Sequence, residues 1–181
     1  EQGVEIPKNV AGLMLAAIIS DTLLFRSPTC TKTDKEIALE LASIAGVDAE
    51  EFGLAMFKAG TSLVGKTIEE IYNQDYKAFN IGDAKVGIAQ VNTMDIDGFA
   101  PLKAEMLEYM ENLCVENGFD TAVLLLTDVI NATSEVFVAG SHPEYVENAF
   151  NVQLVEHEAN LPGVISRKKQ VVPAITRAIN A

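Results

Sequence analysis

Residues 121–130 read TAVLLLTDVI, and this stretch decides the fold class. It is a nearly continuous apolar run that is rich in strand-forming residues. A strand that is apolar at consecutive positions, and not only at alternate ones, is typical of a sheet covered on both faces. The stretch therefore predicts a buried strand at the centre of a layered α/β domain.

The segments around this strand predict a mixed sheet with interleaved helices. Before it, KAFNI and KVGIAQVNT are separated by the turn GDA and read as a β-hairpin, and an amphipathic helix over residues 100–117 ends at Gly118. After it we expect a strand in SEVFVAG, a short helix in HPEYVENAF, a strand in VQLVE (152–156), and a terminal helix in KQVVPAITRAI.

The first third of the chain predicts helices only. A helix with Pro7 in its first turn is expected to run to about Phe25, Thr31 or Thr33 can cap a second helix, and Asp48 can cap a third. The turn-rich stretch GTSLVGKT then separates two expected domains, residues 1–60 and 65–181.

Composition excludes several classes of function. The chain has 181 residues with 13 Lys and Arg against 26 Asp and Glu, a net charge of −13, which disfavours nucleic-acid binding. No apolar run approaches the roughly 18–20 residues of a membrane span, so no membrane contact is expected. Cys30 and Cys114 lack a metal-type spacing and favour the reducing cytoplasm.

Three consecutive cations, Arg167, Lys168 and Lys169, precede the last helix. The helix dipole disfavours cations there unless an anion is bound at the same place by side chains and free backbone N–H groups. The alternative is a solvated basic loop, and the local pattern alone leaves the two about even. The acidity of the whole chain favours an anion site.

Two further residues are candidates for chemistry. Asp21 interrupts an apolar helix, where a carboxylate needs a cation or a metal, although a helix-end carboxylate facing water is the simpler interpretation. Lys77 begins the hairpin and is of interest only if the fold brings it near Arg167 and Lys168. Neither His142 nor His157 has a ligand-type spacing, and no self-sufficient catalytic motif occurs.

These residues lie in motifs that resemble one family. The segments GLMLAAIISDTLLFRSPTCT, AFNIGDAKVGIAQVNT and VISRKKQVVP resemble, in order and over essentially the whole chain, the C-terminal part of family II inorganic pyrophosphatases. These are manganese-dependent enzymes of the DHH phosphoesterase superfamily. The resemblance implies the helical tail of a DHH domain followed by a small mixed-sheet α/β C-terminal domain of the DHHA type.

The resemblance also implies roles for particular residues. Asp21 corresponds to a ligand of a manganese cluster, and Lys77, Arg167 and Lys168 correspond to cations that bind pyrophosphate in a domain that closes over the metals. Lys169 has no implied role. The implied partners are pyrophosphate, the rest of the DHH domain, and a second subunit in a homodimer.

The family's earlier metal-binding motifs are absent from these 181 residues. We therefore expect a fragment that is inactive alone and belongs to a manganese-dependent enzyme that hydrolyses pyrophosphate to two phosphates. The alternatives are an exopolyphosphatase, which uses longer substrates, and a non-catalytic module that binds phosphate groups.

Overall fold

The computed structural model describes residues 5–181, which form two compact units. The first unit ends at Ser62, and the second runs from Leu63 to Ala181. The first is helical and the second combines helices with a five-stranded sheet, so the predicted α/β class is confirmed. Within residues 5–181, every helix is too short or too polar to span a lipid bilayer.

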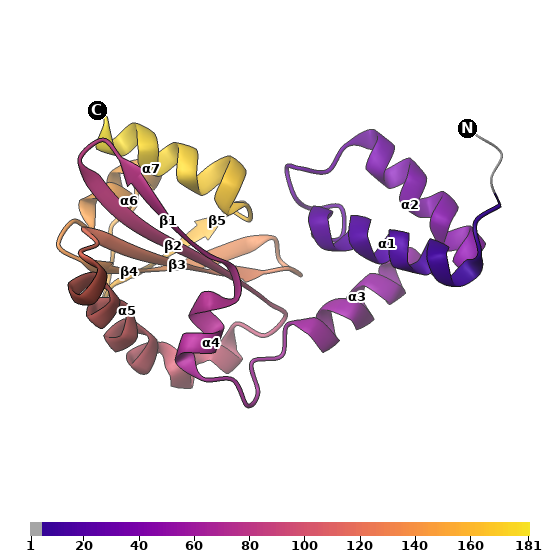
Figure 1. The fold of residues 1–181 in the computed structure, drawn as a ribbon, viewed down its shortest axis with the longest axis horizontal. Coiled ribbons are helices and arrows are strands. Elements are labelled where there is room, and N and C mark those ends of the chain that lie inside the picture. Colours follow the sequence, from indigo (N-terminus) through magenta and orange to yellow (C-terminus); the bar gives the residue numbers. More distant parts are fainter. Residues whose placement is uncertain (1–4) are drawn as a thin grey trace. The chain divides into compact units, whose positions relative to one another are not determined.

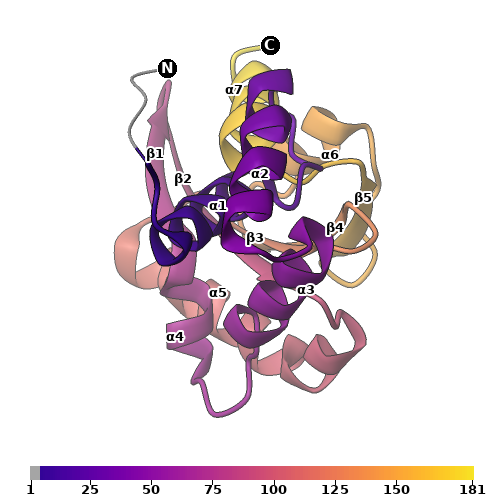
Figure 2. The same ribbon diagram turned by 90° about the vertical axis from the view of Figure 1, so that its right-hand side faces the viewer.

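The first unit consists of three helices, α1 (Lys8–Thr22), α2 (Lys32–Ala45) and α3 (Ala49–Gly60). Helix α2 packs along α1, as the two views in Figure 1 and Figure 2 show. Thr31 forms a capping box at the start of α2, and the Asp48 carboxylate accepts two backbone hydrogen bonds at the start of α3. Both helix starts agree with the capping residues that the sequence indicated.

Helix α1 ends at Thr22, so the expectation that it runs to about Phe25 is wrong. Leu23, Leu24 and Phe25 have φ angles of 47°, 52° and 65°, a left-handed turn of three non-glycine residues. Each such residue costs about 1–2 kcal/mol. Hydrogen bonds hold the turn: the Leu24 N–H donates to the Ile19 carbonyl at 3.0 Å, and the Phe25 N–H donates to Thr22 Oγ1 at 3.2 Å.

The second unit is built on a sheet whose strand order follows the sequence. The central pair β2 and β3 is parallel and the other pairs are antiparallel. All eight residues of β3 are buried, which confirms the interpretation of the apolar run that contains it. The strands are β1 (Tyr76–Ile81), β2 (Ala84–Thr93), β3 (Thr121–Asp128), β4 (Thr133–Gly140) and β5 (Glu158–Pro162).

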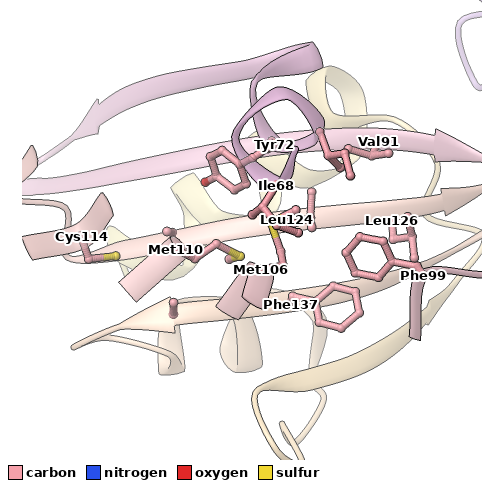
Figure 3. Close-up of a cluster of buried hydrophobic side chains, with 14 of the residues drawn as sticks. Ile68, Tyr72, Val91, Phe99, Met106, Met110, Cys114, Leu124, Leu126 and Phe137 are labelled. Carbon is pink, nitrogen blue, oxygen red and sulfur yellow. The ribbon is translucent and has the colours of Figure 1, made fainter. Parts of the chain in front are cut away.

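Helices cover both faces of this sheet (Figure 1). On one face α4 (Ile68–Tyr72) and α5 (Lys103–Asn117) pack against a cluster that includes Leu124 and Leu126 of β3, and Figure 3 shows Met106 and Met110 reaching into it. On the other face α6 (Glu144–Phe150) and α7 (Val172–Ile179) cover the alternate β3 residues Val123 and Leu125. The apolar run in β3 therefore supplies two cores at once.

The strand predicted over residues 152–156 is wrong, and the last strand is β5. The backbone of this segment is bound to α6 instead: the Val152 N–H donates to the Glu147 carbonyl, and the Leu154 N–H donates to Glu147 Oε1 at 2.9 Å. Glu156 and His157 then adopt positive φ angles of 50° and 70° and reverse the chain into β5. Alternating apolar residues suggested a strand that these local bonds prevent.

Two helix starts also differ from the expected ones. Helix α5 begins at Lys103 and not at residue 100, because a 3₁₀ segment, Asp97–Leu102, precedes it. The last helix is longer than its α-helical part, since a π-helical turn, Arg167–Val171, leads directly into α7. The three consecutive cations lie in this π-helical turn, which rests on the sheet face that α6 and α7 cover.

Candidate functional site

Lys77 lies in β1, an edge strand of the sheet. Its partner in the antiparallel ladder is Ile88 of β2, and directly opposed residues place their side chains on the same face. Ile88 belongs to the core beneath α7, so Lys77 is on the face that carries the π-helical turn. The lysine is exposed, which leaves its ammonium accessible to an anion.

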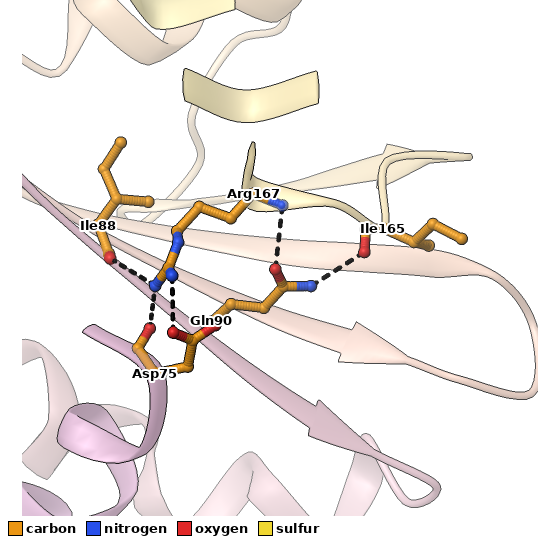
Figure 4. A network of polar contacts seen from close by, with 5 residues as sticks. All are labelled: Asp75, Ile88, Gln90, Ile165 and Arg167. Carbon is orange, nitrogen blue, oxygen red and sulfur yellow. Dashed lines mark hydrogen bonds and ion pairs between the residues drawn. The ribbon is translucent and has the colours of Figure 1, made fainter. Parts of the chain in front are cut away.

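Arg167 begins the π-helical turn, and its side chain is only 9% exposed. Nη1 donates hydrogen bonds to the backbone oxygens of Asp75 and Ile88, and Nη2 donates to Oδ1 of Asp75 at 2.6 Å (Figure 4). Ile88 is also the ladder partner of Lys77. The structure therefore brings Arg167 and Lys77, which are far apart in sequence, to the same part of the β1–β2 hairpin.

Lys168 and Lys169 follow Arg167 and are both exposed. The backbone N–H of Arg167 donates to Gln90 Oε1 at 3.0 Å, and that of Lys169 donates to Ser166 Oγ at 3.3 Å. Two of the backbone N–H groups at this helix start, those of Arg167 and Lys169, therefore already donate to side chains of the protein. An anion here would meet the Lys168 side chain and not the row of free N–H groups that the sequence suggested.

Gln90 is a residue of this site that the sequence interpretation missed. Its Oε1 accepts the Arg167 N–H, and its Nε2 donates to the Ile165 carbonyl at 3.0 Å (Figure 4). The same Nε2 also donates to Thr127 Oγ1 at 2.9 Å. In β2 it shares a face with Val86 and Ile88, two core residues. The sequence signal for Gln90 was a polar residue at a position of the strand that faces the core.

The segment just before Arg167 is fixed by further polar contacts. Ser134 Oγ lies 2.9 Å from Thr127 Oγ1 and donates to the Val164 carbonyl at 2.6 Å. Gln170 Oε1 accepts the backbone N–H groups of Ile165 and Ser166, and its Nε2 donates to Gly163. Together with the Gln90 contacts, these bonds anchor the backbone of residues 163–167 to β2 and β4. The sheet therefore determines the position of Arg167.

A Gln90→Leu substitution should destabilise the chain by about 2 kcal/mol, because an apolar side chain leaves the Arg167 N–H and the Ile165 carbonyl without their partner. The free energy of unfolding in urea measures this. The control is Gln153→Leu at an exposed glutamine, expected to change that energy by less than about 0.5 kcal/mol. Equal losses for the two variants would show that the Gln90 contacts contribute nothing specific.

Asp21 lies in the last turn of α1, in the first unit, and its side chain is exposed. The left-handed turn at residues 23–25 follows at once, and Thr29 Oγ1 donates to the Asp21 backbone carbonyl at 3.1 Å. Among residues 5–181, the carboxylate is exposed and forms no ion pair with a cation. These surroundings are those of a helix-end carboxylate that faces outward. Both of its oxygens remain open to a ligand.

One exposed carboxylate fits a divalent metal only as part of a larger ligand set. Mn²⁺ prefers carboxylate, water and imidazole ligands, and several of them together. Residues 5–181 contain no group of three or more His, Cys, Asp or Glu side chains arranged to hold a metal ion. Asp21 can supply one oxygen ligand to a metal centre, and the other ligands must come from elsewhere.

The buried Cys114 and the partly buried Lys103 offer no competing site. Burial raises the pKa of Cys114 to about 11, so its thiol stays protonated and unreactive at neutral pH. A hydrogen bond to Glu158 raises the pKa of Lys103, which forms ion pairs with Glu135 and Glu158 at 3.7 and 2.9 Å. The charge of Lys103 is compensated by these two carboxylates, and in this respect Lys103 differs from Lys77 and Lys168.

A mixed sheet with helices on both faces, and with Arg167 bonded to the β1–β2 hairpin that carries Lys77, defines a small α/β domain. The model of the DHHA2 domain matches residues 54–178. The chain therefore belongs to the DHHA2 domain family.

Curated relatives match nearly the whole chain. A relative from Clostridium acetobutylicum with the name "Probable manganese-dependent inorganic pyrophosphatase" is 54% identical over 99% of this chain and 58% of the relative. A cobalt-dependent inorganic pyrophosphatase of Clostridium perfringens is 56% identical over 99% of this chain and 33% of the relative. The chain thus spans between one third and about three fifths of these relatives.

A solved structure gives the same result. The crystal structure of a Methanococcus jannaschii protein described as a family II inorganic pyrophosphatase superposes with a TM-score of 0.87 at 45% identity, covering 99% of this chain and 59% of that one. The resemblance to family II inorganic pyrophosphatases is confirmed by these matches, and so is the predicted fold class.

Proposed function

We propose that the full-length protein is a manganese-dependent enzyme that hydrolyses inorganic pyrophosphate to two phosphates. The observation that carries the proposal is the 54% identity, over 99% of this chain, to a relative named for this activity. The contact of Arg167 with the hairpin that carries Lys77 supports it, because a highly anionic substrate needs several cations at one place.

In this proposal the second unit binds the substrate. Lys77 and Lys168 act as exposed point charges on terminal phosphate oxygens, and Arg167 offers a planar fork to one phosphate group. Cations held in fixed positions stabilise the charge that develops on the transferred phosphoryl group without reorganising during the reaction. The polar contacts that anchor residues 163–167 supply this rigidity.

Asp21 takes the role of one ligand in a manganese centre, with the remaining ligands in the rest of a DHH domain. Bound metal ions activate the attacking water and neutralise charge on the substrate. The exposed carboxylate and its fixed position in the last turn of α1 suit this role. We further propose that the intact enzyme is a homodimer and acts in the cytoplasm, where Cys30 and Cys114, both free in the structure, would stay reduced.

The test compares substrates of increasing length with the full-length protein and Mn²⁺. We expect kcat/KM for pyrophosphate to exceed that for tripolyphosphate by about tenfold or more, since a site shaped for two phosphates rejects a longer chain. Phosphate release and product analysis measure this. Preference for long chains would identify an exopolyphosphatase, and binding of pyrophosphate without hydrolysis would identify a non-catalytic module.

A further inference from the structure

The guanidinium of Arg167 has two edges that can each bind a pair of oxygens, one formed by Nη1 and Nη2 and the other by Nη2 and Nε. Asp75 occupies the first edge completely: its backbone oxygen accepts from Nη1 and its carboxylate accepts from Nη2 at 2.6 Å. The second hydrogen atom on Nη1 is donated to the Ile88 carbonyl. The first edge is therefore used by the protein itself.

The second edge remains available. No further hydrogen bond of this guanidinium is present among residues 5–181. The Nε–H and one N–H of Nη2 point the same way in a planar guanidinium, and this pair matches the spacing of two phosphate oxygens. Because the other edge is held at both nitrogens, the direction of the second edge is fixed as well.

A carboxylate next to a cation that binds an anion has two opposite physical consequences. It lowers the local positive potential and so repels the anion, or it orients the cation and lowers the entropy cost of binding. The Asp75 side chain is 56% exposed, so solvent weakens the repulsion. The short ion pair to a guanidinium that is itself enclosed favours orientation as the larger effect.

We propose that Asp75 is a positioning residue for Arg167, which holds one edge of the guanidinium so that the Nε–Nη2 edge is presented to a phosphate group of the substrate. This inference rests on the proposed function and assigns a role to a carboxylate that does not touch the substrate. Asp75 lies immediately before β1, so the same strand start places Asp75 and, two residues later, Lys77.

The test is an Asp75→Asn substitution, which keeps the backbone carbonyl contact and changes only the charge of the acceptor for Nη2. We expect the affinity of the 181-residue chain for pyrophosphate, measured by calorimetry, to fall about fivefold, although the substitution removes a negative charge from an anion site. The control is Asp83→Asn in the β1–β2 turn, the same charge change at the far end of β1, roughly 20 Å away. It should leave the affinity unchanged or slightly higher.

Nuclear magnetic resonance of the arginine Nε–H groups provides a readout that a purely structural role would not change. In the unsubstituted chain, pyrophosphate should shift the Arg167 Nε–H signal, assigned by its loss in Arg167→Lys. In Asp75→Asn the shift should be smaller at equal saturation. Unchanged or tighter pyrophosphate binding by Asp75→Asn, with the unsubstituted chain binding normally, overturns the role of Asp75 and leaves the proposed function intact. Failure of the unsubstituted chain to bind pyrophosphate overturns the role of Asp75 together with the assignment of the second unit as the part that binds the substrate.

Discussion

An Arg167→Ala substitution in the full-length protein is expected to reduce pyrophosphate turnover by about 10²–10³-fold, the usual effect of removing one fixed electrostatic contact to the transition state. The loss should exceed that for any other single cation of the triplet. Arg167 is the buried member of the triplet, and its ion pair to Asp75 ties the π-helical turn to the start of β1. Steady-state phosphate release with Mn²⁺ measures the effect.

The matched control is Lys169→Ala, whose exposed side chain has no role in the proposed site and should change turnover less than about threefold. Arg167→Lys separates substrate binding from stability, since it retains the charge and loses the planar fork. Arg167→Lys should lower the unfolding midpoint less than Arg167→Ala does, and still turn over at least about tenfold more slowly than the unsubstituted protein. Equal losses for Arg167→Ala and Lys169→Ala would remove Arg167 from the site.

A Gly140→Ala substitution is expected to destabilise the second unit by about 3 kcal/mol. Gly140 ends β4 with a φ of 104°, and an added Cβ would lie 2.5 Å from the Asp120 carbonyl oxygen and 3.1 Å from Thr121 Cα. These neighbours are backbone atoms and cannot move aside as a side chain can. The Asp120 oxygen is further held by the His142 N–H at 3.2 Å. The urea midpoint of unfolding measures the loss.

Gly163→Ala is the control for this prediction. Gly163 also has a positive φ, 74°, but no atom lies within 4 Å of its added Cβ. The substitution should therefore cost only the strain of a left-handed residue, about 1 kcal/mol. If the two alanine variants unfold at the same urea concentration, the clash at Gly140 is not the cause of its effect.

The parts of the fold that the sequence predicted are those encoded by neighbouring residues. Thr31 and Asp48 cap helices through bonds that reach only two or three positions along the chain. The buried strand β3 is marked by its own composition. The strand expected at residues 152–156 was wrong because an alternating pattern is also compatible with a segment whose N–H groups bond to Glu147 of the preceding helix.

The candidate site was predicted in part for the same reason. Arg167 and Lys168 are recognisable because consecutive cations are unusual in so acidic a chain. Gln90 and Asp75 act through contacts across 77 and 92 positions of sequence, and nothing local marks Asp75 as a partner of Arg167. Gln90 could have been found as a polar interruption of a strand's apolar face, whereas Asp75 required the structure.

The bond between Asp75 and Arg167 joins residues 92 positions apart, near the two ends of the second unit. During synthesis, the hairpin that carries Lys77 leaves the ribosome long before Arg167 does. The proposed anion site therefore forms only after Arg167 has been synthesised and has docked against the β1–β2 hairpin. Any premature stop before Arg167 removes this contact even though the strands β1–β5 have all been synthesised.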